Sequence, residues 1–519
     1  MMRRATVVGG ALSAMVLAGA ALFATPAAPI SCTALQSLQL PDTKIESATE
    51  VAGPSFTPPD ATGALANLPG FCRVVGVSKP SIRFEVWLPT TTWNGKFQGV
   101  GNGGTAGVIS YSALAAGIRR GYATASTDTG HVSRDSADSE WALKRPDLVA
   151  DFGHRGLHVM TENGKKVTSS FYEAPPKLSY YVGCSKGGQQ GLMEAQRYPN
   201  DYDGLVAGAP ANNATRSYLG GHLWPALATL KDPESYIPAA KVPVLTRAVT
   251  AACDGLDGVT DGIISDPRKC TFDAGTLACG AGQDPGTCFT EKQIKAIKDI
   301  WAGAHDSKGP IYPGVAKGGE TGAGAWERYV TGEGPQRGRH FQLADGFLKF
   351  VVFDDPSYDF RTFNYDRDLP IALKKVAPLI DAVDPNLQPL QSHGAKLIVY
   401  HGWNDPSIPA QNSINYYESV VSALGGANHD AALERTQAFY RMFLVPGMQH
   451  CSGGPGTDRF DMLTALENWV EKGQAPNAIA ASHMTAGKVD RTRPLCMYPQ
   501  TAQYKGSGST DDAANFVCK

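Results

Sequence analysis

One stretch constrains the fold of this chain more than any other: a short apolar run, a glycine-rich turn and a helix-favouring segment, together spanning residues 178–198. The run Leu178–Val182 is rich in residues that favour strands and predicts a buried strand. Gly183-Cys184-Ser185-Lys186-Gly187 then matches G-x-S-x-G, and Gly188–Tyr198 predicts a helix. A strand, a sharp turn and a helix are the surroundings in which this motif exposes a nucleophilic serine. We therefore interpret Ser185 as a nucleophile; the alternative is a turn that merely connects two elements.

Short apolar strands and helices alternate on both sides of this stretch. Strands are predicted at Ile82–Leu88, Lys96–Val100, Gly121–Ser126, Gly204–Ala207, Ala395–Tyr400 and Ala438–Val445, and a last helix at Ala465–Lys472. This alternation indicates an α/β fold, with a mostly parallel sheet that helices cover on both faces.

The alternation stops after about residue 215 and resumes near residue 391. Residues 215–390 contain four cysteines, acidic loops, glycine-rich turns and helical patches such as Thr290–Ala302. We predict that residues 29–214 and 391–519 form one catalytic domain and that residues 215–390 are an inserted lid domain.

The first 28 residues have the pattern of an export signal. Arg3 and Arg4 precede the apolar run Val7–Ala24, and small residues follow that run. A membrane anchor is the alternative, but the run is rich in Ala and Gly and prolines follow it. No other segment predicts a stable membrane association. We expect a secreted or periplasmic protein whose ten cysteines form five disulfides.

The charge balance argues against a nucleic-acid partner. Lys and Arg number 47, Asp and Glu number 49, and the net charge is −2. A protein that binds the phosphate backbone usually carries a basic patch or an excess of positive charge.

A serine nucleophile needs a base and a carboxylate that orients the base. In an α/β-hydrolase the acid and then the histidine follow the serine along the chain, on loops after late strands. Asp405 follows the predicted strand that ends at Tyr400, and His450 follows the one that ends at Val445. His401 lies too close to Asp405 in sequence to be the separate third member. We therefore predict a triad of Ser185, Asp405 and His450.

The reaction also needs backbone N–H groups aimed at the oxyanion of the tetrahedral intermediate. One is expected from Lys186, the residue after the nucleophile. The other is expected from the loop Gly101-Asn102-Gly103-Gly104, which follows an early strand; we favour Gly104, then Gly103. A plain turn is the alternative reading of that loop.

Three carboxylates lie close together within the predicted lid. Asp254, Asp257 and Asp261 fall within eight residues, with glycines between them that let the chain curl. Oxygen-only ligands suit Ca²⁺, although the spacing is not that of an EF-hand. We expect a structural calcium site; the alternative is a solvated acidic turn.

The cysteines that flank the predicted nucleophile and base are a more specific sequence signal than the motif G-x-S-x-G alone. Cys184 precedes Ser185, and Cys451 follows His450. Three stretches carry a resemblance to a known family: Gly183-Cys-Ser-Lys-Gly-Gly188, His401-Gly-Trp-Asn-Asp405 and Gly447-Met-Gln-His-Cys451. The chain resembles the tannase and feruloyl esterase family, which includes the mono(2-hydroxyethyl) terephthalate hydrolases. The resemblance runs over essentially the whole mature chain. It implies an α/β-hydrolase core, secretion and hydrolysis of esters of aromatic carboxylic acids.

The resemblance also implies specific bonds and ligands. It assigns the carbonyls of Val259 and Ile263, with the three aspartates, to calcium. It pairs Cys32 with Cys72, Cys184 with Cys451, Cys253 with Cys270, Cys279 with Cys288, and Cys496 with Cys518.

Taken together, these features predict a secreted serine esterase for a small aromatic ester of feruloyl or galloyl type, derived from plant cell walls or tannins. A terephthalate monoester hydrolase, a serine peptidase and a non-catalytic carbohydrate- or polyphenol-binding protein remain as alternatives. Phe350–Phe360 is either an aromatic wall of the site or ordinary lid core. The sequence leaves open whether Arg328, Arg337 or Arg339 meets a substrate carboxylate.

Overall fold

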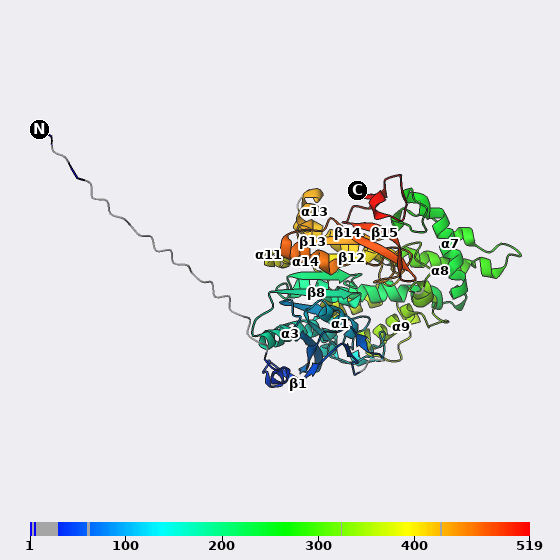
Figure 1. Ribbon diagram of the computed structural model, residues 1–519. Helices are drawn as coiled ribbons and strands as arrows, with labels where there is room; N and C mark the ends of the chain where they lie inside the picture. The colour runs from blue at the N-terminus through cyan, green and yellow to red at the C-terminus, as the bar shows by residue number, and fades with distance from the viewer. Residues whose placement is uncertain (3–4, 7–29, 60–62, 323, 426–427) are drawn as a thin grey trace.

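The computed structural model describes residues 1–2, 5–6, 30–59, 63–322, 324–425 and 428–519 (Figure 1). The export signal predicted at residues 1–28 therefore lies outside the described residues, apart from positions 1–2 and 5–6. Among the described residues, no helix combines the length and the apolar character that crossing a membrane requires.

A nine-stranded sheet forms the centre of the protein, in the order β1-β4-β5-β7-β6-β8-β9-β12-β13. Strands β7 to β13 in this order run parallel, whereas β1, β4 and β5 are antiparallel to their neighbours. The bounds are β1 Thr43–Val51, β4 Phe71–Ser78, β5 Ile82–Pro89, β6 Lys96–Val100, β7 Ala123–Thr127, β8 Leu178–Cys184, β9 Gly204–Gly208, β12 Lys396–Gly402 and β13 Tyr440–Val445. The mostly parallel sheet of an α/β-hydrolase is confirmed, and each strand predicted from the sequence lies within about two residues of an observed one.

Helices cover both faces of this sheet, because successive side chains of a strand point to opposite sides. Tyr181 of β8 packs in a core that includes side chains of α3, α4 and α12. The preceding residue, Tyr180, packs on the other face, in a core that includes side chains of α14. The helices outside the β9–β12 connection are α1 Tyr111–Arg119, α2 Pro146–Ala150, α3 Gly156–Tyr172, α4 Lys186–Arg197, α12 Ala410–Leu424, α13 His429–Gln437 and α14 Met462–Lys472.

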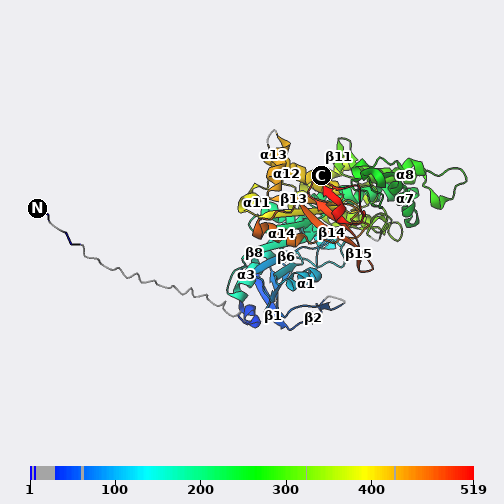
Figure 2. The ribbon, with the colours of Figure 1, turned by 45° about the horizontal axis from the view of Figure 1, so that its top comes forward.

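The connection from β9 to β12 contains the predicted lid and contributes no strand to the central sheet in the described part of the chain. Its helices α7, α8 and α9 gather at one end of the molecule (Figure 1), and α7 and α8 keep that position in the turned view of Figure 2. Its elements are α5 Ala214–Arg216, α6 Trp224–Leu230, α7 Val242–Cys253, α8 Glu291–Ala302, β10 Ala304–Asp306, β11 Gly309–Tyr312, α9 Arg339–Gly346, α10 Tyr365–Ile380 and α11 Gln388–His393. The boundaries at 215 and 390 fall inside this connection and stay a prediction.

The aromatic stretch Phe350–Phe360 belongs to the core of this connection. Phe360 is buried there, and Phe353 and Tyr358 stack with ring centroids 4.2 Å apart. Of the two alternatives that the sequence left open, these observations favour ordinary core, because none of these rings lines the cavity at Ser185.

Small two-stranded sheets complete the fold, and the sequence analysis predicted none of them. They are formed by β2 Ser55–Phe56 with β3 Leu65–Ala66, β10 with β11, β14 Ala478–Thr485 with β15 Lys488–Cys496, and β16 Ala502–Tyr504 with β17 Phe516–Cys518. The ten cysteines form five disulfides, Cys32–Cys72, Cys184–Cys451, Cys253–Cys270, Cys279–Cys288 and Cys496–Cys518, in the pairing that the family resemblance implies.

Candidate active site

The predicted nucleophile occupies a sharp turn between β8 and α4. Ser185 has φ +64° and ψ −118°, a conformation that costs a non-glycine residue of order 1–3 kcal/mol and that clusters at functional sites. The turn is tight: a Cβ at Gly183 would lie 2.6 Å from the carbonyl oxygen of Gly187. The N–H of Ser185 donates to the Gly208 carbonyl at 2.9 Å, which ties the turn to the end of β9.

Three side chains that the sequence analysis selected form one hydrogen-bonded chain. The Ser185 hydroxyl lies 2.8 Å from Nε2 of His450, and Nδ1 of His450 lies 2.7 Å from Oδ2 of Asp405. His450 follows β13, and Asp405 follows β12, so the parallel strands bring both loops to the same edge of the sheet. Oδ1 of Asp405 accepts the N–H groups of Ser407 and Ile408 at 2.8 and 2.9 Å.

The carboxylate of Asp405 is 1% exposed and remains ionised. Burial alone would raise its pKa, but the charge of His450 and hydrogen bonds from His401 and His450 hold that pKa below its ordinary value. An ionised carboxylate at this position can fix the orientation of the His450 ring and stabilise its protonated form.

His401, which the sequence analysis set aside as a base, hydrogen-bonds the carboxylate of Asp405 and so helps to orient it. Its Nε2–H faces Oδ2 of Asp405 at 3.2 Å and the Ile408 carbonyl at 2.8 Å. Its Nδ1 lies 2.8 Å from the hydroxyl of Ser413, which can donate to it. Sequence reasoning missed this positioning role, because a histidine four residues before the acid carries no signal of which way it points.

Two backbone N–H groups predicted for the oxyanion are free to bind it. Lys186 is the first residue of α4, where a backbone N–H has no partner within the helix. Neither its N–H nor that of Gly104 donates to an acceptor in the described part of the chain. Gly104 has φ +55°, and a Cβ there would lie 2.2 Å from the Ser136 carbonyl oxygen, so the loop requires glycine. Both residues line the cavity at Ser185.

The side chain of Lys186 is buried and lies against aromatic surface. Its Nζ donates to Oε1 of Gln189 at 2.6 Å and lies 3.6 Å from the ring centroid of Phe152. Burial lowers its pKa well below the ordinary value of 10.5, which favours an uncharged amine beside the nucleophile.

A cavity of about 460 Å³ opens at Ser185 and His450, a size typical of small-molecule sites. Much of its wall comes from the β9–β12 connection. The wall residues from that connection include Tyr218, His222, Arg328, Tyr329, Arg339 and Leu343. The structure thus places two of the three candidate arginines on the cavity, whereas Arg337 does not line it.

One of these wall residues, His222, pairs with a second buried histidine, His340. Nδ1 of His222 lies 2.9 Å from Nδ1 of His340. Burial lowers the pKa of both rings, that of His340 to about 3, so both are neutral and one must donate to the other. Isolated histidines in helical patches gave no sequence signal for this pair.

The acidic loop of the predicted lid is closed largely by its own hydrogen bonds. Asp254 accepts the N–H groups of Asp261, Gly262 and Ile263, and Asp257 accepts that of Val259. Oδ2 of Asp261 accepts from Arg493 at 2.6 Å. The carbonyls of Val259 and Ile263 accept no hydrogen bond in the described residues. This all-oxygen donor set is of the kind that binds Ca²⁺.

Comparison with known proteins gives consistent results. The model of a family described as tannase and feruloyl esterase matches residues 66–519. An uncharacterized esterase of Xanthomonas campestris pv. campestris is 39% identical, over 96% of this chain and 92% of that protein. The mono(2-hydroxyethyl) terephthalate hydrolase of Piscinibacter sakaiensis is 34% identical, over 88% of this chain and 86% of that protein. The crystal structure of feruloyl esterase B from Aspergillus oryzae matches with a TM-score of 0.85 and 29% identity, covering 94% of this chain and 99% of that one.

Proposed function

This chain belongs to the tannase and feruloyl esterase family, and from that membership we propose that it is a secreted enzyme that hydrolyses esters of aromatic carboxylic acids through an acyl-enzyme. It is a carboxylic ester hydrolase. The observation that carries the proposal is the hydrogen-bonded chain from Ser185 through His450 to Asp405, at a cavity of suitable size.

In the proposed mechanism, Ser185 Oγ attacks the ester carbonyl carbon while Nε2 of His450 takes the hydroxyl proton. The N–H groups of Lys186 and Gly104 hold the oxyanion. When the tetrahedral intermediate collapses, His450 returns the proton to the leaving alcohol. Water then attacks the acyl-enzyme by the same route and releases the acid, while Asp405 stabilises the imidazolium in both steps.

The side chains of the cavity wall are suited to binding an acyl group that has an aromatic ring and a polar end. Tyr218 and Tyr329 supply aromatic surface, and Arg328 and Arg339 supply positive charge. A feruloyl or galloyl ester, of plant cell-wall or tannin origin, presents phenolic oxygens to these groups. A terephthalate monoester, the alternative that the Piscinibacter relative favours, presents a carboxylate.

Two further features belong to this proposal. Export is supported by the five disulfides and by the pattern of residues 1–28. A structural calcium ion would be held by Asp254, Asp257, Asp261 and the carbonyls of Val259 and Ile263. It would balance the charge of the three carboxylates and stabilise the lid without a part in the chemistry.

The experiment is a substrate panel: methyl ferulate, methyl gallate, the terephthalate monoester, and the amide analogue of each acid, assayed with the wild type and with Ser185→Ala. We expect turnover of at least one aromatic ester, none of the amides, and none with the variant. Turnover of the amides as well as of the esters would indicate a peptidase, and binding without turnover would indicate a binding protein.

A further inference from the structure

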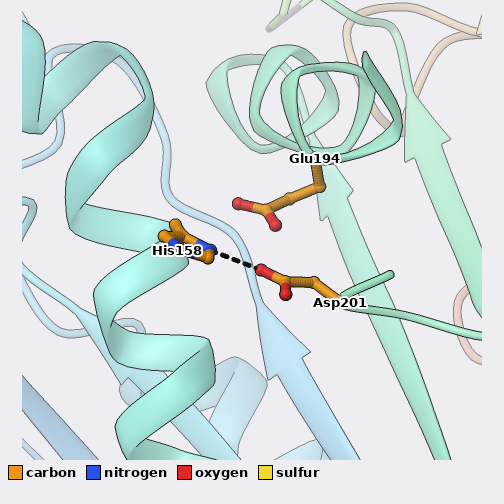
Figure 3. A group of neighbouring side chains, drawn as sticks. All are labelled: His158, Glu194 and Asp201. Atoms are coloured by element: carbon orange, nitrogen blue, oxygen red, sulfur yellow. Dashed lines mark hydrogen bonds and ion pairs between the residues drawn. The ribbon is translucent and has the colours of Figure 1, made fainter. Parts of the chain in front are cut away.

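Three potential metal ligands meet between α3 and α4, the helix that follows the proposed nucleophile (Figure 3). His158 comes from α3, Glu194 from α4, and Asp201 from the loop between α4 and β9. One ligand atom from each residue lies within 4.8 Å of the other two. The acidic loop of the lid does not gather its three carboxylates this closely. Glu194 lies nine residues along α4 from Ser185, about 13 Å at the rise of an α-helix, so the cluster is separate from the esterase site.

Glu194 is the residue that indicates a ligand. It is 1% exposed, and neither of its carboxyl oxygens has a hydrogen-bond partner in the described part of the chain. Figure 3 shows its carboxyl group pointing toward the space between His158 and Asp201. Burial, with the negative charge of Asp201 beside it, raises its pKa well above the ordinary value. A buried carboxyl without a partner is costly, and a bound cation would remove that cost.

The other two ligands already meet in a hydrogen bond, and a bound ion would take the place of the proton that they share. Nδ1 of His158 lies 2.7 Å from Oδ2 of Asp201, and the His158 ring stacks on Tyr198 with centroids 3.8 Å apart. Nε2 of His158 faces Oε2 of Glu162 at 3.7 Å. A histidine that binds a metal through one nitrogen commonly donates its other N–H to a carboxylate, which is the position of Glu162.

The charges also fit one divalent ion. Two carboxylates offer two negative charges, and the exposed side of the cluster is open to solvent, since the side chains of His158 and Asp201 are 25% and 15% exposed. Lys165 is the nearby cation; it donates to the Asp201 carbonyl oxygen rather than to a carboxylate of the cluster.

We propose that His158, Glu194 and Asp201 bind a divalent transition-metal ion of the zinc class, with water completing the coordination. One imidazole nitrogen with two carboxylates suits Zn²⁺, whereas Ca²⁺ and Mg²⁺ prefer oxygen ligands alone. The ion would join α3, α4 and the loop before β9, and so would brace α4 at the end opposite Ser185. Its role is structural, and the inference does not depend on the esterase proposal.

The test is a Zn²⁺ titration of the full-length, chelator-treated protein against a chromophoric chelator, with excess Ca²⁺ present to occupy the lid loop. We expect one Zn²⁺ per chain and a rise in melting temperature. Glu194→Gln should weaken binding by more than the roughly 10–100-fold that loss of an outer-shell partner costs. His429→Gln is the matched control, because His429 pairs with Glu418 on the surface and should leave the affinity unchanged.

Asp201→Asn is a second variant, in case Glu194→Gln does not fold. Since Asp201 is partly exposed, its amide should be tolerated and should weaken Zn²⁺ binding in the same way. Titration of the chelator-treated protein with Co²⁺ gives an independent readout, because a four-coordinate Co²⁺ ion of the kind a zinc site holds absorbs visible light far more strongly than a six-coordinate ion in an all-oxygen loop. Absence of stoichiometric Zn²⁺ binding, or an affinity unchanged in both carboxylate variants, would overturn the proposal.

Discussion

Cys184 and Cys451 are bonded to each other, with their Cα atoms 6.1 Å apart, although 267 residues separate them in sequence. Cys184 precedes Ser185, and Cys451 follows His450. Strands β8 and β13 are not neighbours in the sheet, since β9 and β12 lie between them. The disulfide therefore joins the loops of the proposed nucleophile and base directly, and limits how far they can separate.

Replacing Cys184 and Cys451 together by alanine should lower kcat more than it raises KM. The loss is expected because a small displacement of the base from the nucleophile costs transition-state geometry, and a misplacement of about 1 Å can cost about 100-fold. Steady-state kinetics on the best substrate of the panel measure the effect. The control is Cys279→Ala with Cys288→Ala, which opens a short loop in the lid. Equal effects of both pairs on kcat would show that the first bond serves stability alone.

Ser185→Ala should abolish ester turnover while leaving the fold intact. Loss of a triad serine costs on the order of 10⁶-fold in kcat, because the three residues act as a unit. The measurements are initial rates and a thermal melt, with the exposed Ser422→Ala as control. A variant that kept more than about a tenth of wild-type activity would exclude Ser185 as the nucleophile.

Removal of calcium should lower the melting temperature, and added calcium should restore it. An ion that binds only the folded state stabilises by about 2.7 kcal/mol at a hundredfold excess over its dissociation constant. Mg²⁺ should restore less, because it requires a smaller and stricter octahedral site. Asp257→Asn should reduce the response to Ca²⁺ without changing activity at low temperature, whereas Asp430→Asn, on an exposed helix start, should not. Coincident melts with and without Ca²⁺ would leave the loop as a solvated turn.

Glu320 should make the protein less stable as the pH rises from about 4.5 to about 7. The side chain is fully buried, and burial raises its pKa from 4.5 to about 7, although it accepts hydrogen bonds from the Gly318 N–H and from Trp301. The folded state thus holds the proton more tightly than the unfolded state. Its contribution is fully present below pH 4.5 and is lost as the pH passes the folded-state pKa, a change of about 3 kcal/mol.

Glu320→Gln should remove that part of the pH dependence, and the difference between the denaturant unfolding curves of variant and wild type from pH 4 to 8 measures it. Other buried acids, such as Asp128, contribute to the wild-type slope, so the comparison rather than the slope is diagnostic. The exposed Glu333→Gln is the control. A wild-type-like slope in Glu320→Gln would show that this carboxyl is ionised in the folded protein throughout the range.

The sequence by itself determined the parts of this protein that local pattern encodes. Ser185, Asp405 and His450 each follow a short apolar strand directly, and in a parallel sheet such positions meet at one edge, so their meeting could be predicted without coordinates. Strand β8 and helix α4 were predicted for the same reason, because a buried strand, a glycine turn and a helix are each visible over a few residues.

Only the tertiary structure decided features that depend on which distant residues become neighbours. It placed Arg328 and Arg339, but not Arg337, on the cavity, and it buried Phe360 in a core of the β9–β12 connection. It also left Glu194 beside His158 without a hydrogen bond to any residue that the structure describes. Periodicity predicts the face on which a side chain lies. Burial, desolvation and hydrogen-bond partners, however, arise from packing between separate segments, and no local pattern records them.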